Sequence, residues 1–311
     1  MWRQLERDSG KELLTITGAL MLGAPESRVV KGSLRSAREH NLPHELLDAV
    51  EIRKRFPPFA PAADTVGLFE KQGGFVRPEE AVRAHLKLAT QSGATLRFEE
   101  EIIVWEASRS GVRVTTARGV YEAEQLVIAA GPWLGKLLAE LGLPLRVERQ
   151  VQFWFEPVCG IESLLPGKFP VWIWETRDGT HPYGLPAIDG AVSGVKVSLH
   201  HGGKNPVCTP DSIDRTVSDE EIAMARSCIS ARIPALNGRC VKAVACMYTN
   251  TPDGHFLIDR HPSEPRVLIV SPCSGHGFKF CPVVGEIVAD LVEHDETQHN
   301  LQPFQLARLT K

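Results

Sequence analysis

Hydrophobic residues recur with a helical period in several parts of the chain. Between Pro78 and Gly93, the apolar residues Val82, Leu86 and Ala89 fall on one face of a helix. Proline and acidic residues favour the start of a helix and glycine favours its end, so this segment is expected to form a complete helix. The same spacing predicts helices over residues 1–9, 25–40, 44–56, 134–141 and 283–291.

Other segments have the patterns of β-strands. Residues 126–131 (LVIAAG) are a short continuous apolar run, which is typical of a strand buried on both faces of a sheet. Residues 147–200 contain many β-branched and aromatic residues separated by Pro, Gly and Asp, which predicts an antiparallel sheet. Further short strands are expected at 13–22, 66–69, 96–98, 102–104, 112–114, 243–251, 254–259 and 267–270.

The two kinds of pattern alternate along the chain, which predicts the α/β fold class in an α+β two-domain arrangement. We expect residues 1–14, 77–148 and 253–311 to form an α/β domain. Residues 15–76 and 149–252 are expected to form a β-rich domain that carries most of the large aromatic side chains.

Composition narrows the class of protein. The chain has 311 residues, 43% of them hydrophobic and 23% charged, with a formal net charge of −3. These values are typical of a globular protein and argue against disorder, and the near-neutral charge argues against nucleic acid or an anionic membrane as the main partner. The sequence has neither an apolar run of about 18 residues nor a secretory signal, so we expect an intracellular protein without membrane segments.

The seven cysteines, at positions 159, 208, 228, 240, 246, 273 and 281, are scattered. None forms a CxxC motif or a Cys/His cluster with zinc spacing, and the histidines at 200, 201, 255 and 261 lack partners at metal-ligand spacing. We therefore expect free thiols in a reducing compartment and no metal site.

Four features could carry chemistry. In the turn at 271–280, Gly275 and Gly277 flank His276 and Lys279 follows, which suits close approach to a ligand but equally suits an ordinary loop. Gly131 ends an apolar strand, where an α/β sheet can bind a ligand, although a plain core strand is the commoner case.

The other two features are single residues on expected strands. Lys196 shares a strand face with Ser198 and His200, while Val195, Val197 and Leu199 share the opposite face. The lysine face could equally be solvated, and Cys246 lies among apolar neighbours, where a cysteine is usually a small core residue.

Five strings together resemble one family, the flavin-dependent amine oxidases that contain monomeric sarcosine oxidase, N-methyltryptophan oxidase and pipecolate oxidase. The strings are CMYTNTPDGHFLIDRHP (246–262), SGHGFKFCPVVGEI (274–287), AAGPW (129–133), YGLP (183–186) and GVKVSLHHGG (194–203). The resemblance implies a Rossmann-like FAD-binding domain, made of the first set of segments above, interleaved with an antiparallel substrate-binding domain. The family also has an amino-terminal strand–GxGxxG–helix unit, which is absent here, so neighbouring strands are expected to have an unpaired edge.

The family resemblance implies roles for particular residues. Cys246 matches the cysteine that binds FAD covalently through a thioether, Lys196 the lysine that assists reaction with oxygen, and Lys279 the lysine that pairs with the substrate carboxylate. His200, Tyr248, Tyr183 and Ile173 match or lie near the substrate pocket. The segments expected to pass close to the flavin contain Gly131, Gly275, His276, Gly277, Phe278 and Lys279.

The implied activity is the FAD-dependent oxidation of a secondary amino acid, N-methylated or cyclic, to an imine while O2 is reduced to H2O2. The partners are then a small amino acid and O2, with no nucleic acid and no membrane, and the protein is expected to be a monomer. We expect a cytoplasmic location, because the sequence ends in Leu-Thr-Lys and not in the peroxisomal signal Ser-Lys-Leu. A peroxisomal location is the alternative. Two alternatives stay open: a truncated, non-catalytic remnant, or an enzyme of the glycine or D-amino-acid oxidase type, which lacks the cysteine linkage.

Overall fold

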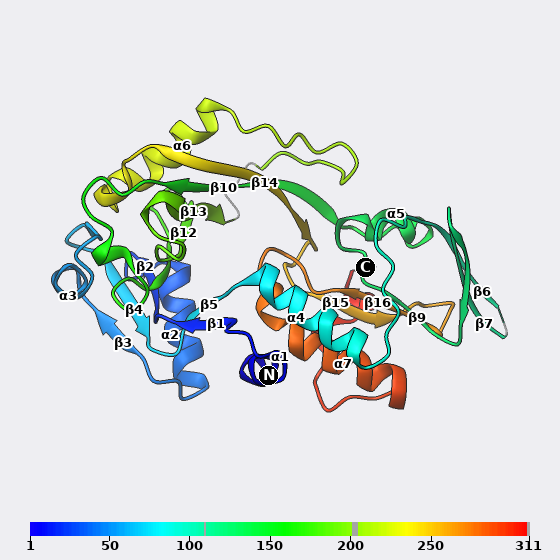
Figure 1. Cartoon of the computed structure of the whole chain (residues 1–311). Helices are drawn as coiled ribbons and strands as arrows, with labels where there is room; N and C mark the ends of the chain where they lie inside the picture. The colour runs from blue at the N-terminus through cyan, green and yellow to red at the C-terminus, as the bar shows by residue number, and fades with distance from the viewer. Residues whose placement is uncertain (109, 201–204, 310–311) are drawn as a thin grey trace.

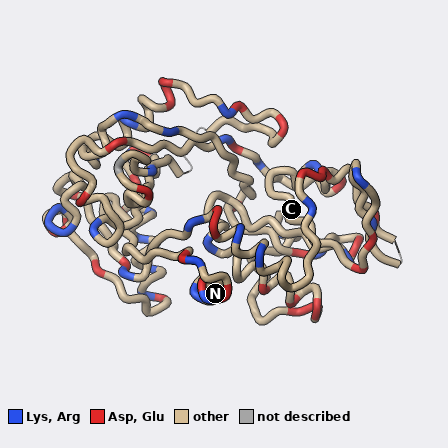
Figure 2. The backbone as a smooth tube through the Cα atoms, viewed as in Figure 1, with Lys and Arg blue, Asp and Glu red and all other residues tan. Residues whose placement is uncertain are grey.

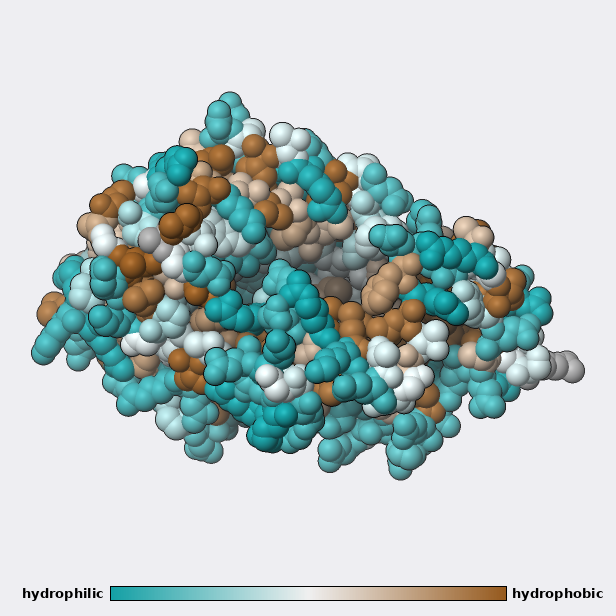
Figure 3. Space-filling model, viewed as in Figure 1, coloured by the Kyte–Doolittle hydropathy of each residue, from teal (hydrophilic) through white to brown (hydrophobic). Residues whose placement is uncertain are grey.

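The computed structural model describes residues 1–108, 110–200 and 205–309. Figure 1 shows two lobes joined along one side by the long strands β10 (Arg146–Phe155) and β14 (Cys240–Asn250). Charged residues of both signs are interspersed over the two lobes (Figure 2). The visible face of the molecule is hollowed near its middle, with hydrophobic residues along part of the rim (Figure 3).

Most helices follow the predicted pattern, but the helix expected over 134–141 ends at Leu137, and a separate 3-10 helix covers Ala139–Leu141. Three have side-chain caps: the Ser27 and Asp48 side chains accept hydrogen bonds from the first turns of α2 and α3, and Ser218 caps α6. The helices are α1 (Trp2–Ser9), α2 (Arg28–Glu39), α3 (Ala49–Arg55), α4 (Pro78–Gln91), α5 (Leu134–Leu137), α6 (Asp219–Ser230) and α7 (Cys281–His294). None of these helices, nor any other among the described residues, has the length and apolar character needed to cross a membrane.

The larger lobe is built on an eight-stranded sheet with the order β14-β10-β13-β12-β11-β2-β4-β3. All neighbouring pairs are antiparallel except β11 with β2, which are parallel. The remaining strands of this sheet are β13 (Val195–His200), β12 (His181–Gly184), β11 (Val171–Trp174), β2 (Ala19–Gly23), β4 (Val66–Glu70) and β3 (Glu45–Leu47).

One face of this sheet is packed into the main hydrophobic core. Alternate residues of β10, β13, β11 and β2 contribute to it, and helices α3 and α6 add Ile52 and Ile229. Phe59 stacks on Phe169 with ring centroids 4.8 Å apart. The buried members of the sheet are Phe153, Phe155, Val195, Val197, Trp172, Trp174, Leu20 and Leu22. The opposite face is therefore free to carry polar side chains.

The smaller lobe contains a three-stranded sheet with the order β15-β16-β9, formed by Leu257–Arg260, Val267–Ser271 and Leu126–Ile128. All five residues of β16 are buried, and α7 packs against this strand through Val284 and Ile287. Strand β9 lies at the edge of this sheet, which agrees with the expected unpaired edge. The prediction that β9 is buried on both faces is wrong: Val127 is 36% exposed. Val127 points to the same face as Leu268, where α7 packs, but it is not part of the hydrophobic cluster that α7 forms with Leu268 and Val270.

Two local predictions also fail. Residues 45–47 form the edge strand β3, paired antiparallel with β4, rather than the first turn of a helix; long-range pairing overrides the helical pattern, and Asp48 then starts α3. Residues 96–98 are not a strand, and Phe98 is 62% exposed, because no strand in the described part of the chain pairs with them.

A small antiparallel sheet and a strand pair complete the fold. The former contains β6 (Ile102–Ser108), β7 (Gly111–Thr116) and β8 (Gly119–Ala123). The strand pair joins β1 (Leu14–Ile16) to β5 (Gly74–Val76) beside a small core in which α1 packs on α4. This arrangement places the amino-terminal helix next to the loop that precedes α7 (Figure 1).

Candidate active site

Strand register places the candidate residues on one face of the eight-stranded sheet. Residues directly opposite each other on paired strands point to the same face. Trp154 is opposite Lys196, and Gln150 is opposite Cys246. Ser198, which shares the face of Lys196, is opposite Tyr183, which in turn is opposite Ile173. This surface, opposite the main core and here called the site face, carries Ile173, Tyr183, Lys196, His200, Cys246 and Tyr248.

An aromatic cluster occupies one part of the site face. His200 Nδ1 lies 3.3 Å from the Tyr248 hydroxyl, and the His200 ring meets those of Tyr183 and Tyr248 edge-on, at centroid distances of 6.2 and 5.8 Å. Burial raises the pKa of both tyrosines above the usual value, so both phenols stay protonated and can donate hydrogen bonds.

Lys196 is a half-buried cation on this face. Burial lowers the pKa of its ammonium group; Cys246 and Glu79 act to raise it, and Lys242 acts to lower it. No carboxylate in the described part of the chain forms an ion pair with Lys196. Burial raises the pKa of the half-buried Cys246 thiol, against the opposing effect of the positive charge on Lys196. A partly desolvated cation and a thiol thus occupy one polar surface.

The loop between β16 and α7 packs directly on the site face. Gly275 has a φ of +76°, and a Cβ built on it would lie 2.5 Å from the ring of Tyr248. Only glycine combines this backbone conformation with so close a contact. The Ser274 amide donates to the carbonyl of Thr249 in β14, so the loop is also tied to the strand that carries Cys246.

The remaining loop residues are placed differently. His276 Nε2 lies 3.0 Å from the carbonyl of Gly254 and its ring packs on Phe256, so its contacts are structural. Lys279 is exposed, with its ammonium 5.5 Å from the Phe280 ring centroid. The Trp2 indole donates to the Lys279 backbone carbonyl, which anchors this segment to α1. The structure thus places Lys279 beside the site face rather than on it.

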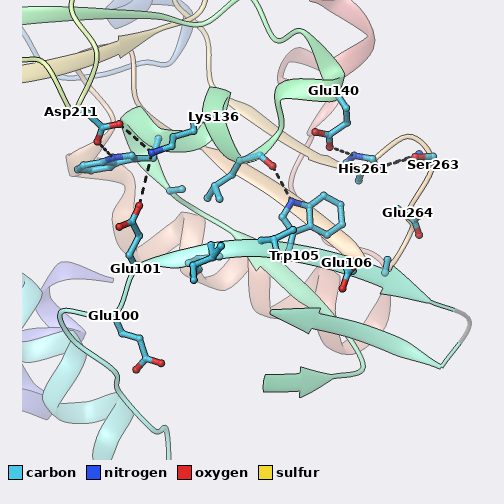
Figure 4. A pocket seen from close by; sticks show the side chains of 17 residues that line it. Glu100, Glu101, Trp105, Glu106, Lys136, Glu140, Asp211, His261, Ser263 and Glu264 are labelled. Atoms are coloured by element: carbon cyan, nitrogen blue, oxygen red, sulfur yellow. Dashed lines mark hydrogen bonds and ion pairs between the residues drawn. The ribbon is translucent and has the colours of Figure 1, made fainter. Parts of the chain in front are cut away.

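A cavity of about 1110 Å³ lies on the other lobe, and no candidate residue lines it (Figure 4). Trp133 and Lys136 line it, and both contact Asp211. His261 lies between Glu140 and Ser263 on the opposite side of the cavity. Sequence reasoning missed this cavity, although Trp133 follows Gly131 in the AAGPW string and could have indicated it.

The chain is similar to known proteins over its whole length. The family model described as FAD dependent oxidoreductase matches residues 1–291. Monomeric sarcosine oxidase of Streptomyces avermitilis is 50% identical over 310 residues, which are 99% of this chain and 80% of that protein. N-methyl-L-tryptophan oxidase of Salmonella typhi is 31% identical, over 100% of this chain and 82% of that protein.

Solved structures show the same fold at lower identity. NikD, an unusual amino acid oxidase essential for nikkomycin biosynthesis, superposes with a TM-score of 0.82 at 23% identity, over 98% of this chain and 80% of that one. Glycine oxidase from Geobacillus kaustophilus gives a TM-score of 0.78 at 24% identity, over 99% of this chain and 79% of that one. The mixed α/β fold with several sheets is therefore confirmed as that of the amino acid oxidases.

The family model and the 50% identical relative define a flavin-dependent oxidoreductase that acts on CH–NH donors. The chain belongs to the family of FAD-dependent oxidoreductases, in the group of monomeric sarcosine oxidase and N-methyltryptophan oxidase. The predicted family, enzyme class and FAD cofactor are confirmed, and the 50% identity favours this group over the glycine oxidase type, for which only the fold is shared.

The site face suits the flavin ring of FAD. Gln150, beside Cys246, is only 3% exposed, and its amide nitrogen Nε2 has no hydrogen-bond partner in the described structure. A buried donor without a partner is costly unless a ligand accepts its hydrogen bond, and the flavin ring carries several acceptors. The charged residues that line the cavity near Gly131 are mostly carboxylates, including Glu101 and Asp211, with Lys136 as the one lysine among its described lining residues. Carboxylates suit hydroxyl or amine donors better than a pyrophosphate.

Proposed function

We propose that this protein oxidises the C–N bond of a secondary amino acid, N-methylated or cyclic, to an imine and reduces O2 to H2O2. The observation that supports this most is the strand register that places Lys196, Cys246 and the tyrosine–histidine cluster on one polar face. The names of the relatives indicate sarcosine and N-methyl-L-tryptophan as the substrate classes to test first.

In this proposal Cys246 holds FAD covalently through its sulfur, and the Gln150 amide hydrogen-bonds the ring. When bound, FAD accepts a hydride from the carbon beside the amine nitrogen and transfers the electrons to oxygen. The exposed Phe278, Gly131 and the Gly275–Gly277 turn are the further segments that would contact the cofactor. Gly275 supports this role because its missing side chain lets the loop approach Tyr248 closely.

Lys196 stabilises the negative charge that develops when oxygen is reduced. Its partial burial strengthens this effect, since a cation acts more strongly where water is excluded. The absence of an ion-pairing carboxylate among the described residues leaves its charge available for that purpose. Lys196 is therefore a catalytic residue in this proposal.

Lys279 binds the substrate carboxylate, and the site-face aromatic residues form the walls of the substrate pocket. Tyr248 and Tyr183 stay protonated and donate hydrogen bonds, while His200 and Ile173 lie on the same face. Walls of this kind exclude water, which favours the neutral form of the amine that the reaction requires.

The domain division given above stays part of the proposal. It is supported by the separation of the eight-stranded sheet from the β15-β16-β9 sheet, and by the β1–β5 pair, which lies at the boundaries near residues 14 and 77. We also propose a monomer in the cytoplasm, because the Streptomyces avermitilis relative is named monomeric and all seven cysteines are free thiols.

The first experiment is an absorbance spectrum of the purified protein, taken before and after acid precipitation. Flavin bands that stay with the denatured protein support covalent FAD, and a panel of secondary amino acids assayed for peroxide then identifies the substrate. A colourless protein that also fails to bind added FAD would contradict the proposal and favour the remnant alternative.

A further inference from the structure

Three residues on neighbouring strands form a row at one end of the site face. Trp154 on β10 lies between Lys196 on β13 and Lys242 on β14, and it is directly opposite each of them. The Lys196 ammonium is 5.6 Å from the Trp154 ring centroid, and the Lys242 ammonium is 4.8 Å from it. Two cations thus share one indole ring, at distances where the ring attracts a cation.

The two lysines differ in their surroundings. Lys196 is half-buried, whereas Lys242 is exposed to solvent. The charged or titratable groups that act on Lys196 are Cys246 and Lys242 on β14 and Glu79 at the start of α4. Trp154 lies within cation–π range of Lys196.

We propose that Trp154 and Lys242 act through Lys196: the indole of Trp154 holds the Lys196 ammonium in position on the site face, and the charge of Lys242 opposes that of Lys196. Trp154 is then a positioning residue, and Lys242 adjusts how readily Lys196 keeps its proton. This inference rests on the role proposed above for Lys196 in the reaction with oxygen.

The two neighbours have opposite effects on the charged state of Lys196. The ring attracts only the ammonium form, so Trp154→Leu should lower the pKa of Lys196. Lys242 repels the ammonium form, so Lys242→Gln should raise that pKa. Each shift in the pKa of Lys196 is expected to be about half a pH unit. In Trp154→Phe, the pKa of Lys196 should lie between its values in Trp154→Leu and in the unmodified protein.

The test measures the charge of Lys196 directly. Acetic anhydride reacts only with the neutral amine, so the pH dependence of Lys196 acetylation, followed by mass spectrometry of its peptide, gives the pKa of this side chain. Lys242→Arg keeps the neighbouring charge and is the matched control, with an unchanged midpoint expected. Opposite shifts in Trp154→Leu and Lys242→Gln support the proposal; any other combination overturns it.

A second measurement separates this inference from the proposed function. The rate at which O2 reoxidises the reduced holoenzyme should depend on pH, and the midpoint of that dependence should shift in each variant as the pKa of Lys196 does. If Lys196→Met reoxidises at the unmodified rate, the oxygen role of Lys196 is wrong, while the acetylation midpoints still decide whether Trp154 and Lys242 control its charge. If reoxidation of Lys196→Met is slow and the acetylation midpoints of the Trp154 and Lys242 variants do not move, only the present inference fails.

Discussion

The indole nitrogen of Trp2 donates a 2.9 Å hydrogen bond to the backbone carbonyl of Lys279, 277 positions later in the sequence. The Trp2 ring also stacks on Phe278, with centroids 6.0 Å apart, and meets His85 of α4 edge-on. Helix α1 therefore supports the segment that carries the proposed carboxylate-binding lysine.

This contact predicts a binding defect in Trp2→Phe, which keeps the stacked ring but loses the donor. The loss of one neutral hydrogen bond should raise KM for the amino acid about fivefold and leave kcat nearly unchanged. Trp105→Phe is the matched control, because it loses an equal 2.9 Å bond to the Leu137 carbonyl far from this loop. Equal KM values in the two variants would show that the anchor does not position Lys279.

Covalent attachment predicts a clear result for Cys246→Ser. Flavin should no longer stay with the acid-precipitated protein, because a hydroxyl does not replace the thiolate as nucleophile. Cys240→Ser, on the same strand, should retain the bound flavin fully. Retention of flavin in Cys246→Ser would assign the link to another residue.

The proposed oxygen role predicts that Lys196→Met slows reoxidation of the reduced enzyme about 100-fold. Anaerobic reduction by the amine should be unchanged, which stopped-flow absorbance measures separately. Lys168→Met, an exposed lysine in a turn, is the control. Because burial lowers the pKa of Lys196, the unmodified enzyme should lose its fast reoxidation as pH rises through a value below 10.5.

The close contact between Gly275 and Tyr248 predicts that Gly275→Ala destabilises the protein by about 1–3 kcal/mol, measured by urea unfolding. The new methyl group combines left-handed strain with a clash against the ring. Gly179→Ala has a similar φ of +78° but nothing within 4 Å of the new Cβ, so it should cost less. Equal losses would mean that backbone strain alone accounts for the effect.

The unpaired buried amide of Gln150 leads to two predictions for Gln150→Leu, one for the stability of the flavin-free protein and one for its affinity for FAD. Gln150→Leu removes a buried donor without a partner, so the flavin-free protein should be as stable as before or more so. Affinity for FAD, from fluorescence titration of flavin-free Cys246→Ser protein with and without the change, should fall about fivefold. Gln152→Leu, on the same strand and face, should leave affinity unchanged. A less stable flavin-free protein with normal FAD affinity would make Gln150 a structural residue.

Sequence patterns alone determined most of the helices and strands of this protein. Pro78 at its start and Gly93 after its end correctly predicted helix α4, and β13 follows the alternation of valines with Lys196 and Ser198. These features depend on neighbours within a few residues, which the sequence displays directly. The motif strings likewise indicated the family, because backbone and cofactor constraints act on contiguous residues. The predicted apolar face of α4 is wrong, because Val82 is 45% exposed and the helix packs on α1 through Ala81 and Ala84 instead.

The tertiary structure alone decided what depends on long-range pairing. Residues 45–47 became a strand because β4 pairs with them, and 96–98 did not because no described strand does. Register across separate strands, not spacing along the chain, brought Lys196 and Cys246 to one face, with Trp154 beside them. A one-residue slip would turn each side chain to the opposite face, so strand pairing over tens of residues had to be known first.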